Sequence, residues 1–171
     1  MSVTVPMKGD KTRNTIADGV YAVDVGVARN VNPRLAVGGT VSVAAYLFDE
    51  SEEWDLLLGL QPRARLWLDR QLSVDFFLGP AFVVRRDRDV KIIDSPVYTV
   101  GAGINFSSWF AGFGQIDVYD SREQYWDASA GRILTLKNRV VAPYLGARLC
   151  SYWGAAASVV PLAILLGVLT S

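Results

Sequence analysis

The sequence predicts an all-β protein: an antiparallel up-and-down barrel or curved meander sheet of about eight strands, followed by an apolar C-terminal helical tail. Three observations carry this prediction. Apolar residues alternate with polar or small ones from Gly19 to Leu149, which is the period of strands with two different faces. Short groups of turn-forming residues separate the alternating stretches, as in a meander. The alternation then ends, and residues 149–171 carry no charge.

The chain of 171 residues is long enough for one domain. Residues 1–18 are polar and lack the apolar core of a signal peptide, so we expect an N-terminal extension there. The β body is predicted over residues 19–148, and the apolar tail over residues 149–171.

The order of the strands follows from turn and charge signals. Asparagine and proline at 30–33 predict the first turn. Pro62 cannot donate a ladder hydrogen bond, so it predicts a bulge, an edge or a break in its strand. The charged segments 49–53 and 85–96 are expected to be loops, as is the segment with Tyr125 and Trp126. The expected strands lie near 21–27, 35–47, 54–68, 72–84, 97–106, 109–119, 133–136 and 140–149.

The tail is predicted to attach the protein to a membrane. Its 23 residues match the roughly 20 apolar residues that a helix needs to cross the hydrocarbon layer, and Pro161 would kink such a helix. A helix packed on the body and a terminal strand remain alternatives. The candidate membrane-anchor residues are Tyr152, Trp153, Val159, Val160, Leu162, Ile164, Leu165 and Leu166.

The composition argues against several classes of function. Seventeen basic and seventeen acidic residues leave no net charge to attract nucleic acid. The chain has no histidine, which excludes a Ser-His-Asp triad and the commonest metal ligand. A single cysteine, Cys150, cannot form an intramolecular disulfide or a thiolate zinc site. We therefore expect a non-enzymatic protein with no cofactor and no metal.

Alternation alone leaves open which face of the sheet lines the interior. One face carries Leu, Val and Phe, while the other carries glycine, serine and a few arginines and aspartates. Small residues with scattered charges are typical of a narrow lumen closed by ion pairs. On this pattern, residues 19–149 resemble small eight-stranded outer-membrane barrels. The resemblance implies that the Leu/Val/Phe face contacts lipid and that the polar face lines the lumen.

Two groups of residues are candidates for functional or structural contacts. Charged residues on the polar face are expected to form ion pairs, either as a structural network or as an ion path. Arginines and aromatic residues near the loops are candidate interface residues, because such residues dominate interface hot spots. The alternatives are a solvated loop for the arginines and a core or membrane girdle for the aromatic residues. The ion-pair candidates are Asp24, Arg63, Arg65, Asp75 and Asp117; the interface candidates are Arg85, Arg86, Arg88, Trp109, Phe110, Tyr125 and Trp126.

Three functions are compatible with these features. The first hypothesis is an accessory or scaffold subunit of a larger membrane complex, such as a bacterial respiratory or photosynthetic complex. It would contact integral-membrane subunits and lipid, with a cytoplasmic body at the inner membrane. The second is a small outer-membrane barrel that acts as an anchor or a narrow pore. The third is a lipocalin-like carrier, with a cavity lined by Leu56, Leu58, Phe76 and Phe82.

Overall fold

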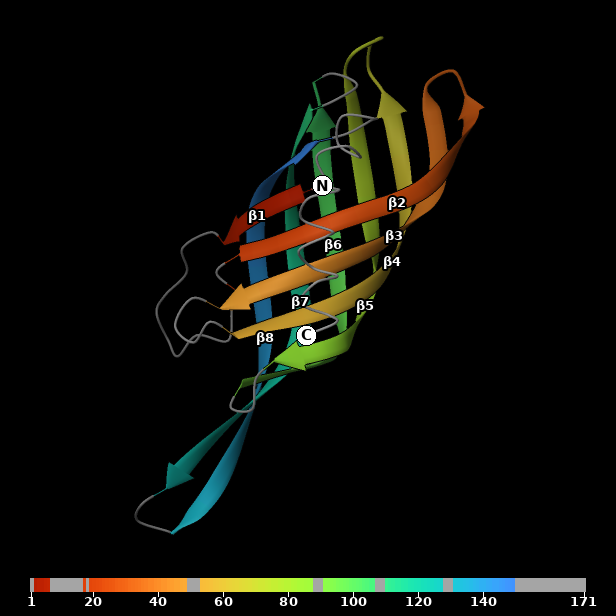
Figure 1. The fold of residues 1–171 in the computed structure, drawn as a ribbon. Helices are drawn as coiled ribbons and strands as arrows, with labels where there is room; N and C mark the ends of the chain where they lie inside the picture. The colour runs from red at the N-terminus through yellow and green to blue at the C-terminus, as the bar shows by residue number, and fades with distance from the viewer. Residues whose placement is uncertain are drawn as a thin grey trace.

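The computed structural model describes residues 2–6, 17, 19–48, 53–87, 91–106, 110–127 and 131–149. Within these ranges it contains strands and turns and no helix (Figure 1). The strands are β1 (Ser2–Pro6), β2 (Gly19–Asn32), β3 (Leu35–Phe48), β4 (Glu53–Trp67), β5 (Ser73–Asp87), β6 (Lys91–Asn105), β7 (Phe110–Asp127) and β8 (Arg132–Leu149).

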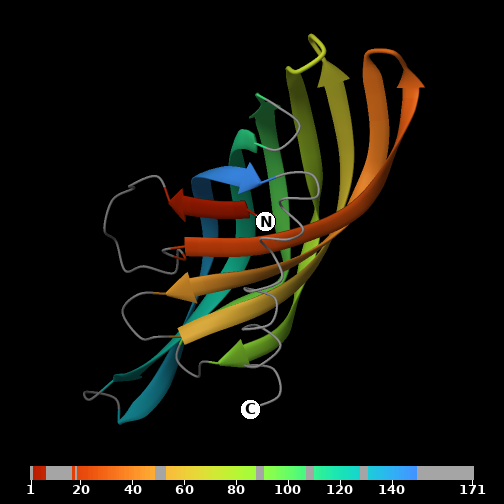
Figure 2. The ribbon, with the colours of Figure 1, turned by 45° about the horizontal axis from the view of Figure 1, so that its top comes forward.

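Consecutive strands pair antiparallel, so the predicted antiparallel meander is confirmed. The turn after β2 is stabilised by Asn32, whose side-chain oxygen accepts hydrogen bonds from the backbone of Arg34 and Leu35, each at 2.8 Å. We call this end of the sheet the Pro33 end, and the opposite end, where β7 turns into β8, the Gly131 end. Figures 1 and 2 show the β7–β8 hairpin projecting beyond the other strands at the Gly131 end.

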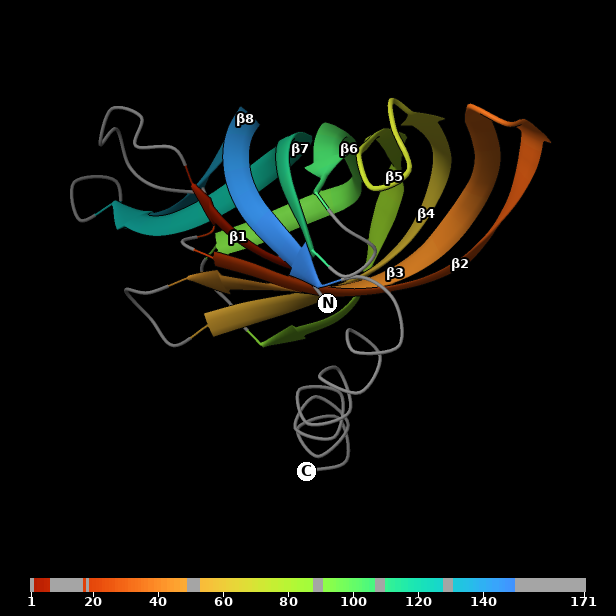
Figure 3. The ribbon, with the colours of Figure 1, turned by 90° about the horizontal axis from the view of Figure 1, so that it is seen from above.

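The short strand β1 joins the first and last long strands. Ser2–Thr4 pair with Val20–Ala22 of β2, and Ser2–Pro6 pair with β8, so the order of paired strands returns to its start. No pairing joins β2 to β8 directly within the described ranges. Figure 3 shows β8 ending beside the N-terminus while β2 continues past it. The sheet is therefore strongly curved and bridged at one place, rather than a barrel closed along its length.

The strand boundaries differ from the prediction in four places. Part of the expected N-terminal extension is strand β1, and the two segments expected near 133–136 and 140–149 are one strand, β8. Strands β5 and β6 extend into the charged segment 85–96, and β7 continues through Tyr125 and Trp126. The register of β4 with β5 shifts between Leu56 and Leu57, and their pairing is interrupted at residues 60–62, which include Pro62. Charge suggested loops here, but ion pairs and cross-strand pairing allow charged residues inside strands.

The side chains of the predicted Leu/Val/Phe face mostly point outward. Leu58, Phe76 and Phe82 are 43%, 53% and 48% exposed, so these three do not line a cavity as the lipocalin hypothesis required. Leu56 is buried, but it is not among the residues around the internal cavity described below. Small, polar and charged residues occupy the opposite, inner face. The structure thus places the Leu/Val/Phe face on the outside of the curved sheet.

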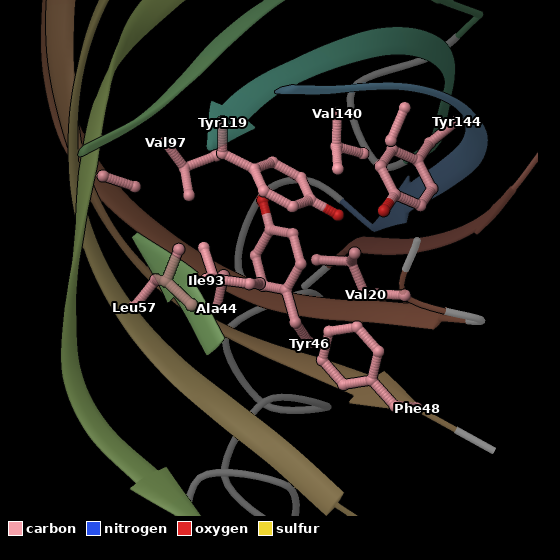
Figure 4. Packing of buried hydrophobic residues seen from close by; sticks show 13 residues of the cluster. Val20, Ala44, Tyr46, Phe48, Leu57, Ile93, Val97, Tyr119, Val140 and Tyr144 are labelled. Carbon is pink, nitrogen blue, oxygen red and sulfur yellow. The ribbon is translucent and has the colours of Figure 1, made fainter. Parts of the chain in front are cut away.

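The inner face is apolar only toward the Gly131 end. There, aromatic and aliphatic side chains from β2, β3, β4, β6, β7 and β8 pack together (Figure 4). We call this group the aromatic cluster; its larger members are Val20, Tyr46, Phe48, Leu57, Ile93, Val97, Tyr119, Val140 and Tyr144. Toward the Pro33 end, the inner face is charged instead.

Candidate functional site

The charged part of the inner face centres on Asp24. Its Oδ2 lies 3.2 Å from Nη2 of Arg148 on β8 and 3.5 Å from Nη2 of Arg63 on β4. The neighbours of Asp24 across β3 and β4 in the pairing register are Ser42 and Gly59. These small residues leave space for the two long arginine side chains to meet the carboxylate. One carboxylate therefore stabilises two largely buried guanidinium groups.

Two phenylalanine rings support the arginines. The guanidinium carbon of Arg148 lies 4.8 Å from the ring centre of Phe113 and 5.3 Å from that of Phe77, and the guanidinium carbon of Arg63 lies 5.4 Å from the Phe77 ring centre. The two rings meet edge to face, 6.1 Å apart. A Cβ atom on Gly101 would overlap the Phe77 ring. Glycine at this position thus makes room for a cation–π stack.

A second ion pair lies nearer the Pro33 end. Arg65 donates two hydrogen bonds to Asp75, from Nε at 2.6 Å and from Nη2 at 2.8 Å. Asp75 is almost fully buried, whereas about a third of the Arg65 side chain is exposed. Such a two-point contact fixes the guanidinium plane as well as its position. Arg65 and Asp75 therefore form a two-point ion pair between the neighbouring strands β4 and β5 on the inner face.

Asp117 is fully buried, and its hydrogen-bond partners among the described residues are neutral. Tyr46 and Thr99 each donate a hydroxyl hydrogen bond of 2.7 Å to its carboxylate, and the Gln115 amide donates at 3.1 and 3.2 Å. The structure thus brings Asp24 to Arg63 and Asp75 to Arg65, but it holds Asp117 with hydroxyl and amide donors instead of a cation.

A small internal cavity separates the Asp24 and Asp117 groups. It offers about 20 Å³ to the centre of a water molecule, which is room for about one or two waters. The Nε atoms of Arg63 and Arg148 and Oε1 of Gln61 are buried without a hydrogen-bond partner among the described residues. Residues that line the cavity include Asp24, Ser42, Tyr46, Gln61, Thr99, Gln115 and Arg148.

The predicted interface residues are only partly described. Arg86 points toward the buried Asp55, with Nε 3.6 Å from Oδ1, and donates a 2.6 Å hydrogen bond to the carbonyl of Ile93. Arg85 lies 5.6 Å from the Trp54 ring centre, and Phe110 stacks on Phe106. Arg88 and Trp109 lie outside the described residues, as do the side chains of Tyr125 and Trp126 and all eight candidate anchor residues of the tail. The three described candidates, Arg85, Arg86 and Phe110, contact different neighbours, and the interface stays a prediction.

The comparisons with known proteins give no relative. No protein-family model matches the chain, no curated protein matches its sequence, and no solved structure matches its fold. No helix in the described part of the chain is long and apolar enough to span a membrane. Among the same residues, no group of three acidic or cysteine side chains is arranged to bind a metal ion.

Sequence reasoning missed several members of the inner network. Arg148, the last residue of the predicted body, was assigned no contact, and Tyr46 and Thr99 were assigned no role. The face of the sheet on which each of them lies could be predicted, because each alternates with outward apolar neighbours. Their partners were not, since Tyr46 and Asp117 are 71 positions apart in the chain.

Proposed function

We propose that the strands of this protein lie in a lipid bilayer and that the protein is a non-enzymatic structural anchor of the outer-membrane barrel type. One observation carries the proposal: the outer face is apolar over the length that a bilayer requires. On six strands, the exposed large apolar residues extend over nine to eleven residues, and a tilted strand needs about 9–11 to cross the hydrocarbon layer. The end residues are Tyr21–Val31, Val37–Leu47, Leu58–Leu68, Phe76–Val84, Tyr98–Phe106 and Val141–Leu149.

The distribution of charge supports the same orientation. Within those six stretches, Arg29 is the one charged residue at an outward position among the described residues. It lies three residues from the end of β2, where a long side chain can reach the membrane surface. The other charged side chains of these stretches point inward, and in water the reverse arrangement is expected.

The packed Gly131 end of the inner face favours an anchor over a pore. The aromatic cluster occupies the Gly131 end, and the Arg65–Asp75 pair occupies the Pro33 end. The cavity between them has room for about one or two waters. A conducting lumen would need a continuous polar channel, as in larger barrels.

Full closure of the barrel belongs to this proposal. In hydrocarbon, an unpaired strand edge leaves backbone groups without hydrogen bonds, at several kcal/mol each. The edge of β2 from Val23 to Asn32 has no partner among the described strands on the side of β1. We therefore expect this edge to be covered in the bilayer. Slow amide exchange of Gly26 and Ala28 in vesicles would report this, because their backbone groups alternate with those of Val27, which face β3.

The scaffold hypothesis differs in what attaches the protein. It places the attachment at residues 149–171, of which the structure describes Leu149 alone. Truncation after Arg148 should leave the protein in the membrane if the strands hold it there. Release into the soluble fraction with the sheet still folded would favour the scaffold at the inner membrane.

The decisive experiment places an arginine on the outer face. Leu78 is 59% exposed near the middle of its apolar stretch, so Leu78→Arg should lower the free energy of unfolding in phosphatidylcholine vesicles by about 2–4 kcal/mol. Leu68→Arg, at 58% exposure beside a turn, is the matched control and should cost about 0–1 kcal/mol. A protein whose outer face contacts water would tolerate both, with changes within about 0.5 kcal/mol. Urea titration of both variants measures the difference.

A further inference from the structure

The outer face changes from apolar to charged where β7 and β8 leave the rest of the sheet. Val118 pairs with Val141 in the register, and both lie at outward positions. The next outward pair toward the Gly131 end is Asp120 with Arg139, followed by Arg122 with Lys137. On the neighbouring strand β6, Asp94 is aligned with Asp120. We call these five charged residues the β7–β8 patch.

The patch has an excess of positive charge. Arg122 contacts Asp94 at 2.6 Å, and Arg139 donates a 3.0 Å hydrogen bond to Asp120. That bond raises the pKa of the exposed Arg139 guanidinium. Lys137 is exposed and has no ion pair among the described residues. Three cations thus face two carboxylates.

The register makes this excess unfavourable unless an anion is present. Arg122 and Lys137 are directly opposite each other on paired strands, and like charges in that position destabilise a sheet. Asp94 balances Arg122 and Asp120 balances Arg139, so the charge of Lys137 is left over. A single negative group placed beside Lys137 would neutralise the patch.

The height of the patch matches the lipid headgroups. At about 3.3 Å per residue and a tilt of about 45°, two residues advance about 5 Å along the membrane normal and four residues about 9 Å. The headgroup layer is about 5–8 Å thick on each side of the hydrocarbon. If Val141 marks the hydrocarbon boundary, Arg139 lies within this layer. Lys137 lies about 1–4 Å beyond it, and its long side chain can reach back to a phosphate.

We propose that the β7–β8 patch binds the phosphate of an anionic phospholipid, with Lys137 as the main contact and Arg122 and Arg139 beside it. This proposal rests on the proposed function, because the patch reaches headgroups only if the strands lie in the bilayer. An anionic lipid supplies the missing negative charge at that height, whereas a zwitterionic lipid brings its own cation.

The test compares two variants with equal loss of charge. Lys137→Gln removes the central cation of the patch. Arg132→Gln is the matched control, because Arg132 is exposed on the same strand but alternates onto the opposite face, five residues nearer the hairpin end. The full chain is inserted in vesicles of phosphatidylcholine or of phosphatidylcholine mixed equally with phosphatidylglycerol. Native mass spectrometry after mild detergent extraction then counts retained lipids, and protease protection measures insertion separately.

We expect the wild-type protein to retain phosphatidylglycerol in preference to phosphatidylcholine. Lys137→Gln should weaken that preference about fivefold, the equivalent of about 1 kcal/mol per basic residue at a membrane surface. Arg132→Gln should change it less than about twofold. Normal insertion without a preference for phosphatidylglycerol, or an equal loss in both variants, would overturn the lipid site and leave the patch to an acidic protein partner. Failure to insert in either vesicle would overturn the proposed function, and the lipid site with it.

Discussion

The inward side chains at the two ends of the inner face come from the same alternating positions of the strands, but they are stabilised in different ways. Toward the Gly131 end, the aromatic cluster buries large side chains against one another. Toward the Pro33 end, Asp24 and Asp75 hold three arginines through charge and hydrogen bonds. In apolar packing, the loss of unfolding free energy grows gradually with the volume of side chain removed. In a buried ion pair, the loss of one partner leaves an unpaired buried charge, which is strongly destabilising. The two ends should therefore differ sharply in their tolerance to substitution.

The largest effect is expected from Asp24→Leu. The substitution removes the carboxylate shared by Arg63 and Arg148 and leaves two adjacent buried cations. We expect the free energy of unfolding to fall by about 3–5 kcal/mol, measured by urea titration in vesicles. Asn30→Leu on the same face of β2 is the control, because Asn30 is exposed and its change should stay within about 0.5 kcal/mol. A loss below about 1 kcal/mol for Asp24→Leu would show that water already compensates the arginines.

Gly101→Ala probes the same end through packing instead of charge. The new methyl group would overlap the Phe77 ring and displace it from beneath Arg63 and Arg148. Overpacking of this kind typically costs about 1–3 kcal/mol. Gly112→Ala on β7 is the control, because its Cβ would lie 3.7 Å from the nearest atom, on Phe106, which is ordinary contact. Equal stability of the two variants would mean that the ring moves aside without cost.

Alternation predicted the sheet and the shared face of Asp24, Arg63, Arg65, Asp75 and Asp117, because parity depends on local sequence alone. It did not predict that Arg148 would share Asp24 or that Tyr46 and Thr99 would hold Asp117. Those contacts depend on register and curvature across strands far apart in the chain. The alternation also did not predict which face of the sheet points outward. The segment 85–96 was predicted as a loop because of its charges, but its Ile93 is 1% exposed and its Arg86 reaches inward.

The smallest expected effect tests the aromatic end. Ile93 is 1% exposed within the aromatic cluster, so Ile93→Val removes one buried methyl group and should cost about 0.5–1.5 kcal/mol. The same substitution at Ile133, which is 61% exposed on the projecting hairpin, should change the unfolding free energy by less than about 0.5 kcal/mol. The contrast with Asp24→Leu measures how much more a lost charge partner costs than a lost methyl group. If Ile93→Val lowered the unfolding free energy as much as Asp24→Leu, the aromatic end would be as sensitive to substitution as the charged end, and the proposed contrast would be wrong.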